Sequence, residues 1–198
     1  WNGMEGGKAL AEVLFGDIAP SGKLPFTFPL KLEDSPAYAM GNFPDKNSGG
    51  DLFTLMYRLD ATGLTREEIH EYIDNLPDPE SRYTEGILVG YRWFDTKEVP
   101  VMYAFGHGLS YVDFGYGELK CKTRKDKISV DFALTNEGSM EADEVVQLYV
   151  RRPESKVERP YKELKAFDRI TLKAGETKTV SLEVPISELA HWDMEKNC

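Results

Sequence analysis

The stretch Ile128-Ser129-Val130-Asp131-Phe132-Ala133-Leu134-Thr135 decides the fold class of this chain. Large apolar side chains alternate there with small or polar ones, and this is the period of a β-strand that buries one face. Val180, Leu182 and Val184 repeat the pattern, and residues 146–150 alternate in the same way. We therefore predict that this part of the chain is built from strands around one core.

The segments between these strands favour an antiparallel β-sandwich. Residues 136–139 and 174–176 have the composition of turns. Residues 164–172 are apolar but break strict alternation, which predicts a bulge. Short strands at about ten-residue spacing are typical of a sandwich, and we expect five or six of them between residues 112 and 198. Because a seven-stranded sandwich needs at least one more, we expect this one to stop before its last strands.

A helical region is predicted near the start of the chain. Residues 8–15 carry apolar side chains on most sides, which predicts a buried helix, and Gly16 follows where a helix-ending glycine belongs. Residues 24–29 are short, extended and bracketed by prolines, so we expect an edge or a strand-like crossing there.

The middle of the chain is predicted to be irregular apart from a helical hairpin. Glycines, prolines and short polar residues predict a loop at 31–50. The hairpin is expected at about 51–76, and the capping-box pair Thr65 and Glu68 marks its second helix. After a linker, the β-branched and aromatic residues of 87–94 predict a strand.

Composition excludes several classes of protein. The 198 residues carry 24 basic and 34 acidic side chains, a net charge of −10, which would repel the phosphates of a nucleic acid. No apolar run is long enough to span a membrane, and two cysteines, Cys121 and Cys198, are too few for a disulfide framework. A neutral sugar is compatible with this charge. Because the chain begins at Trp1, we expect it to be part of a longer protein.

The residues that usually hold metals or act as nucleophiles form no known pattern. His70, His107 and His191 lie far apart, so no metal site is expected. No cofactor is expected, because the glycines form no phosphate-binding loop. Ser110 lies in a sequence that resembles a nucleophile elbow only loosely. We interpret residues 105–110 instead as a tight, glycine-flanked turn at a domain junction.

Acidic residues are abundant, so each one is a weak candidate for acid–base chemistry. Hydrolysis of a glycoside needs two carboxylates across the scissile bond. Glu5 is interpreted chiefly as a capping residue at a helix N-terminus, with a substrate contact as the alternative. Glu85 is open to the same two interpretations. The acidic stretch 137–144 is interpreted as a solvated turn.

Aromatic residues are dense in one part of the sequence. Tyr91, Trp93, Phe94, Tyr103 and Phe105 could stack on sugars or pack between two domains. Packing between domains is the interpretation we favour.

Whole segments of the chain resemble glycoside hydrolase family 3. Residues 1–25 follow the pattern W-x-G-x-E-G-G-x-A-x-A-x-V-L-F-G-D-x-x-P-S-G-K-L-P. Residues 83–95 resemble a second motif of that family, and residues 105–111 resemble the lead-in to its fibronectin type III-like domain. Residues 144–150 and 158–167 resemble that domain itself. The motifs occur in the family's order and cover nearly the whole chain.

The resemblance implies a parent protein with a barrel, an α/β sandwich domain and this terminal β-sandwich. Such enzymes are retaining and exo-acting; most are β-glucosidases, and some are xylosidases. Their nucleophilic aspartate lies in the barrel and their acid/base glutamate lies upstream of the segment present here. Glu5 matches the E-G-G signature, which is not the acid/base position. No catalytic residue is therefore assigned in this chain, and its substrate-binding residues are unknown.

The resemblance divides the chain into three parts. Residues 1–31 are expected to end the α/β domain, residues 32–111 to connect the domains, with the hairpin at about 51–76 as an insertion, and residues 112–198 to form the fibronectin type III-like sandwich. The parent is expected to act on oligosaccharides or aryl glycosides in carbohydrate catabolism and to be periplasmic or secreted in a bacterium. The present chain is expected to be an inactive scaffold.

Two other roles stay open. The alternative to a scaffold is a non-catalytic module that binds carbohydrate or protein. Self-association into a homodimer through an open sandwich edge is a further alternative.

Overall fold

The computed structural model describes residues 3–43, 63, 65, 67, 68, 71, 74, 75 and 82–192. The chain divides into two compact units. The first unit combines Trp1–Thr27 with Tyr103–Cys198, and the second comprises Phe28–Met102. The first unit therefore joins the N-terminal segment to the strand-rich C-terminal half.

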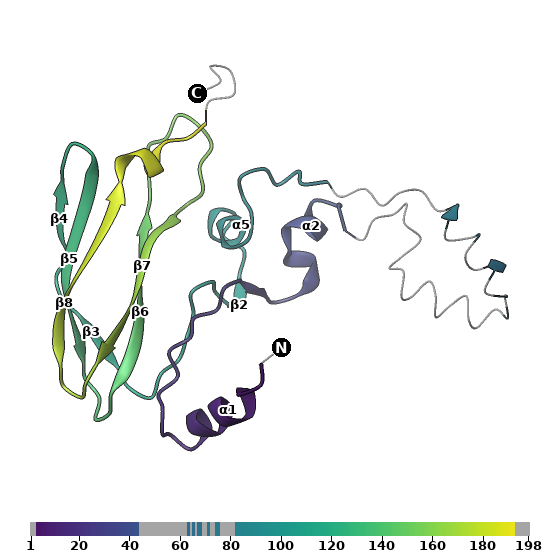
Figure 1. Ribbon diagram of the computed structural model, residues 1–198. Coiled ribbons are helices and arrows are strands. Elements are labelled where there is room, and N and C mark those ends of the chain that lie inside the picture. The colour runs from purple at the N-terminus through teal and green to yellow at the C-terminus, as the bar shows by residue number, and fades with distance from the viewer. Residues whose placement is uncertain are drawn as a thin grey trace. The chain divides into compact units, whose positions relative to one another are not determined.

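The described part of the first unit contains a β-sandwich of six strands, as the turn spacing predicted. One antiparallel sheet contains β3 (Phe114–Tyr116), β4 (Lys120–Thr123), β5 (Lys127–Asn136) and β8 (Thr177–Pro185), and the other contains β6 (Ala142–Val150) and β7 (Glu163–Leu172). Strand β5 is central, because it pairs with β8 along nearly its whole length and with β3 and β4 on its other side. The two sheets lie face to face (Figure 1).

The core of the sandwich fills the space between the sheets. The first sheet supplies Val130, Phe132, Leu134, Val180 and Leu182, and the second supplies Val146 and Leu172. The inward and outward alternation predicted for β5 and β8 is thus confirmed by the burial of their apolar residues. Burial of apolar surface between two such faces is the main stabilising contribution to a fold of this kind.

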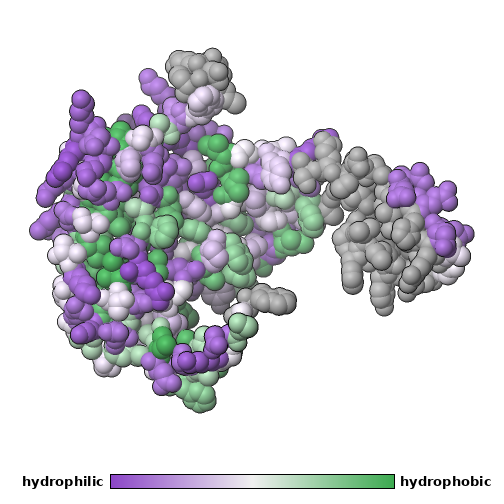
Figure 2. Space-filling model, viewed as in Figure 1, coloured by the Kyte–Doolittle hydropathy of each residue, from purple (hydrophilic) through white to green (hydrophobic). Residues whose placement is uncertain are grey.

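The bulge predicted for residues 164–172 is present in β7. Leu148 pairs with Ala166, but Tyr149 pairs with Leu164, so Lys165 is the extra residue of β7. At the opposite edge of the sandwich, all four residues of β4 are exposed. Figure 2 shows hydrophilic side chains gathered around β4 and the turn that follows it. Lysines on an edge strand disfavour pairing with another chain.

The turn predicted after β5 is closed by a buried amide. Asn136 has no exposed surface. Its Nδ2 donates to the carbonyls of Met140 (2.8 Å) and Leu172 (3.0 Å), and its Oδ1 accepts from the backbone N–H of Gly138 (2.9 Å). This amide therefore ties the end of β5 to the start of β6 and to the end of β7.

Helix α1 (Gly6–Leu14) ends as predicted, but it is not buried. The N–H of Asp17 donates to Glu12 O (2.9 Å) and that of Gly16 to Val13 O (3.1 Å), which is a Schellman ending with Gly16 at a φ of +82°. No residue of the helix is buried, and Leu14 is 69% exposed. The prediction was wrong because apolar residues all round a helix are buried only where other elements surround it, and the described residues do not surround α1.

The described part of the second unit contains short elements only. They are β1 (Phe28–Pro29), the 3₁₀ helix η1 (Leu32–Asp34), α2 (Pro36–Ala39), α5 (Tyr91–Thr96) and the first two residues of β2 (Val101–Tyr103), which pairs with β1. The loop predicted for 31–50 is wrong over its described part, because η1 and α2 form there. Pro36 occupies the first turn of α2, where its missing N–H has no helical partner to lose.

The strand predicted at 87–94 is also wrong, because helix α5 begins at Tyr91. The residue before it, Gly90, has a φ of +61° and turns the chain into the helix. Phe94 is the buried residue of α5. Burial of this side chain overrides the β-propensity of the segment, because that propensity depends on a pleated, half-buried setting.

The predicted hairpin at 51–76 lies largely outside the described residues. Its capping box is confirmed: Glu68 Oε2 accepts from the N–H of Thr65 (2.8 Å), and Thr65 Oγ1 accepts from the N–H of Glu68 (3.3 Å). Glu71 and Asp74 are helical. The first helix of the hairpin lies outside the described residues.

Candidate functional site

Three segments that are far apart in the sequence meet in the first unit. The N–H of Leu24 donates to His107 O (2.8 Å), and the N–H of Gly106 donates to Leu24 O (2.8 Å). Gln147 of β6 then donates from Nε2 to Gly106 O (3.0 Å). Residues 20–25, 105–111 and 144–150 therefore form one hydrogen-bonded assembly, which we call the junction cluster.

The backbones in the junction cluster approach so closely that a side chain would not fit between them. A Cβ atom on Gly108 would lie 2.6 Å from the carbonyl oxygen of Gly22. The predicted turn at 105–110 is confirmed, since Gly106 has a φ of +79° and the N–H of His107 donates to Ala104 O (3.1 Å). Glycine is thus required in this turn both for its conformation and for the close contact.

A largely buried ion pair lies at the centre of the junction cluster. Lys23 Nζ is 2.9 Å from Glu144 Oε2, and the two side chains are 18% and 11% exposed. The other carboxylate oxygen, Oε1, accepts from the Tyr116 hydroxyl at 2.8 Å. Partial burial of the phenol and its hydrogen bond to Glu144 raise the pKa of Tyr116 above its usual value. Both oxygens of this carboxylate are therefore satisfied by hydrogen bonds.

This ion pair corrects the interpretation of residues 137–144 as a solvated turn. Glu144 is only 9% exposed, and it lies within β6 on the same face as Val146. The alternation along the strand places residues 142, 144 and 146 inward together. This period of two was the sequence signal that could have identified Glu144 as a buried residue.

A second, more exposed ion pair fastens the same segment to the sandwich. Arg169 of β7 donates from Nε to Asp143 Oδ2 (2.7 Å) and from Nη2 to Ser21 Oγ (3.2 Å). A hydrogen bond from Thr171, together with Arg169, lowers the pKa of Asp143. The N-terminal segment is therefore held by polar contacts to both strands of the β6–β7 sheet.

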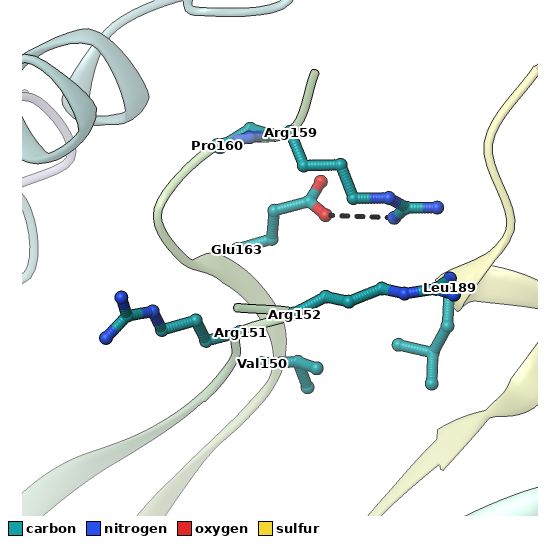
Figure 3. Close-up of a pocket in the computed structure, with 7 residues that line it drawn as sticks. All are labelled: Val150, Arg151, Arg152, Arg159, Pro160, Glu163 and Leu189. Atoms are coloured by element: carbon teal, nitrogen blue, oxygen red, sulfur yellow. Dashed lines mark ion pairs between the residues drawn. The ribbon is translucent and has the colours of Figure 1, made fainter. Parts of the chain in front are cut away.

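A pocket of about 210 Å³ lies at the far end of the same sheet. It is lined by Val150, Arg151, Arg152, Arg159, Pro160, Glu163 and Leu189, the last from the 3₁₀ helix η2 (Ile186–Leu189). Figure 3 shows the side chains of Arg152 and Arg159 extended in the same direction, toward Leu189, while Arg151 points the other way. Arg159 Nη1 is 3.9 Å from Glu163 Oε2. We call this the arginine pocket.

The structure places the candidate carboxylates and Ser110 outside any described catalytic arrangement. Glu5 occupies the N-cap position of α1, as the capping interpretation expects, but its side chain makes no capping hydrogen bond. Glu85 Oε2 and Ser110 Oγ are both buried with no hydrogen-bond partner in the described part of the chain. No described carboxylate therefore pairs with Ser110.

The histidines are likewise dispersed. The ring of His107 lies 5.3 Å from that of Tyr103, and His191 Nδ1 lies 3.0 Å from Arg159 Nη2. His70 lies outside the described residues. Across residues 3–43 and 82–192 and the few described positions between them, no three His, Cys, Asp or Glu residues are grouped to hold a metal ion. None of the described helices has the length and apolar character needed to cross a membrane.

The five candidate aromatic residues fall in different units. Tyr91, Trp93 and Phe94 belong to the second unit, where Phe94 is buried, while Tyr103 and Phe105 belong to the first. Sugar stacking and packing between domains both stay predictions for them.

Two family models match most of the chain. Residues 1–111 match the model of the glycosyl hydrolase family 3 C-terminal domain, and residues 144–198 match that of the fibronectin type III-like domain. The junction cluster thus contains segments from both matched regions.

Curated relatives have names that describe glycosidases. Thermostable beta-glucosidase B of Acetivibrio thermocellus is 37% identical over 194 residues, which are 96% of this chain and 21% of that protein. An exo-alpha-(1->6)-L-arabinopyranosidase of Bifidobacterium breve is 35% identical over 98% of this chain and 22% of that protein. The chain therefore spans about a fifth of the length of the curated relatives it matches.

Solved structures of beta-glucosidases are also similar to this chain. Beta-glucosidase 3B of Thermotoga neapolitana, determined in complex with glucose, is similar with a TM-score of 0.74 and 35% identity over 94% of this chain and 22% of that one. A beta-glucosidase of Kluyveromyces marxianus in complex with glucose is similar with a TM-score of 0.76 and 32% identity.

Proposed function

The chain belongs to glycosyl hydrolase family 3, and from this membership we propose that it is the C-terminal, non-catalytic part of a retaining, exo-acting glycosidase. A β-glucosidase that releases terminal β-linked sugars from oligosaccharides or aryl glycosides is the first choice, because most of the similar proteins carry that name. Two relatives named arabinopyranosidases extend the range of sugars to be tested.

The role of this part is to hold the end of the α/β domain against the sandwich. The observation that carries this role is the junction cluster, in which Lys23 of the N-terminal segment forms a largely buried ion pair with Glu144 of β6. A catalytic site requires its groups to be held within a fraction of an ångström. Rigid attachment of the domain that borders the site is therefore a useful contribution to activity.

We propose that the chain has the three parts that its sequence predicts. Residues 1–31 close the α/β domain, residues 32–111 connect it to the sandwich, and residues 112–198 are the fibronectin type III-like sandwich. The nucleophile and the acid/base residue belong to parts of the parent protein that precede this chain.

The first test combines the coding sequence upstream of Trp1 with an activity assay of the complete protein. The coding sequence upstream of Trp1 should encode a barrel with a candidate nucleophilic aspartate, and the complete protein should hydrolyse an aryl β-glucoside. A Glu144→Gln variant of the complete protein should lose activity at a lower temperature than the wild type with an unchanged KM at 25 °C. A raised KM with unchanged thermal inactivation would contradict a scaffold role.

A second test separates the scaffold from the alternative of a binding module. A scaffold alone should not be retained on insoluble glucan or xylan, whereas a carbohydrate-binding module should be. Retention of the 198-residue chain on either polymer, released by soluble oligosaccharide, would favour the alternative.

A further inference from the structure

The arginine pocket differs in charge from the rest of the molecule. Its lining includes three arginines and one acidic residue, Glu163, in a chain whose net charge is −10. Glu163 is shared, because Lys165 Nζ also lies 3.5 Å from its Oε1. The single carboxylate therefore does not balance the positive charge gathered around it.

Two guanidinium groups of the pocket have unused hydrogen-bond donors. Arg159 is 11% exposed as a side chain, and its Nη2 lies 3.0 Å from His191 Nδ1, but its Nε is buried with no partner among the described residues. The side chain of Arg152 makes no hydrogen bond or ion pair to any described residue. Buried donors without partners are costly, so an acceptor that reaches Arg159 Nε would be bound favourably.

The third arginine, Arg151, is paired with Tyr161 and forms one side of the pocket. The Arg151 guanidinium lies 4.0 Å from the centre of the Tyr161 ring, and its Nη1 donates to the Tyr161 hydroxyl at 3.0 Å. Figure 3 shows it turned away from the other two arginines. The space for a ligand is therefore on the side of Arg152 and Arg159, beside the apolar wall formed by Leu189.

We propose that the arginine pocket binds the carboxylate of an acidic sugar, such as a uronic acid residue of a glycan. A guanidinium presents a planar fork of donors that matches a carboxylate or a phosphate. A pocket of about 210 Å³ is smaller than the sites that hold drug-sized ligands, so it accommodates one sugar unit and not a long oligosaccharide. The choice of a sugar carboxylate over phosphate rests on the proposed function of the parent in glycan breakdown.

The experiment titrates the ¹⁵N-labelled 198-residue chain with sodium glucuronate, glucose and inorganic phosphate, and records the signals of the arginine side chains and of residues 150–163. Glucuronate should shift these signals in a saturable way, and glucose should not. Arg152→Gln should weaken glucuronate binding about tenfold or more, since it removes a charge-assisted hydrogen bond. Arg152 is exposed, so this variant should fold.

The matched control is Lys173→Gln, which removes the same charge at the opposite end of β7. It should leave the affinity for glucuronate unchanged. Arg159→Gln should abolish binding, and its folding is checked from the dispersion of the remaining signals.

Three results would count against the proposal. Binding of phosphate without glucuronate would overturn the acidic-sugar assignment, and absence of any shift with both anions would overturn the site. An equal loss of affinity in Lys173→Gln would show that only net charge matters. Because binding is measured without turnover, the proposal can fail while the parent is an active glycosidase, and the reverse also holds.

Discussion

The Lys23–Glu144 pair shows how one carboxylate can connect two distant parts of a chain. Its side chains are 18% and 11% exposed, so most of their hydration is lost. A buried ion pair often contributes little net stability relative to apolar residues, but removal of one partner leaves a charge without compensation. The pair therefore acts mainly by making any other packing of residues 20–25 unfavourable.

We predict that Glu144→Gln destabilises the chain by about 3 kcal/mol in urea unfolding, because Lys23 then keeps a desolvated charge. The double variant Lys23→Met/Glu144→Leu should recover most of that loss. Lys8→Gln, which breaks the exposed pair with Glu12, is the control and should not move the midpoint. If Glu144→Gln unfolds at the wild-type urea concentration, the pair does not hold the segment.

The hydroxyl of Tyr116 predicts a pH dependence at the same site. Its pKa is raised in the folded state, so the native chain keeps a proton that the unfolded chain loses above about pH 10. Its contribution to stability is complete below pH 10 and is lost as the pH rises toward the folded pKa.

The Tyr116→Phe variant should therefore lose stability less steeply than the wild type between pH 10 and pH 11, as measured by urea unfolding at fixed ionic strength. Parallel declines in the two proteins would show that the raised pKa of Tyr116 does not contribute.

At the scale of elements, Asn136 joins three strand ends. The amide lies at the end of β5 and satisfies two backbone carbonyls and one N–H; its bond to Leu172 is buried and the other two are partly buried. A side chain of this kind fixes which strand ends meet, because no apolar residue can replace its three hydrogen bonds.

Replacement of Asn136 by Ala should lower the free energy of unfolding by about 2–4 kcal/mol, since it leaves buried backbone groups without partners. Thr135→Ala, one residue earlier, removes an exposed hydrogen bond to Thr177 and should change it by less than about 0.5 kcal/mol. Similar effects of the two substitutions, measured by thermal unfolding, would contradict the importance of the buried amide.

The elements that could be predicted from the sequence are those with a clear period. Strands β5 and β8 and the bulge of β7 follow from alternation, and the end of α1 follows from Gly16. The segment 87–94 was mispredicted because its evidence was composition without a period, and tertiary burial of Phe94 decided its structure. The burial of helix α1 was wrongly predicted, because the sequence of a helix does not determine which elements surround it.

The sites were less predictable than the elements. The turn at 105–110 was predicted, but its pairing with Leu24 joins residues that no local pattern connects. Glu144 could have been recognised from its place in the alternation of β6. The arginine pocket could not have been recognised from the sequence, because its side chains come from two strand ends and from η2.

At the scale of the whole molecule, residues matched by two different family models lie in one compact unit. The segment 1–27 belongs with the sandwich and not with the residues that follow it in sequence. Self-association through an open sandwich edge stays a prediction, and light scattering at increasing concentration tests it. A molar mass that stays at the value of the monomer up to millimolar concentration would exclude self-association.

The central claim is that this chain supports a glycosidase without carrying out its chemistry. The most direct measurement is the release of aglycone from an aryl β-glucoside by the purified 198-residue chain, compared with the same chain after heat denaturation. We predict no difference between the two samples at any pH from 4 to 9. Turnover that is lost on denaturation and that copurifies with the chain would contradict the claim.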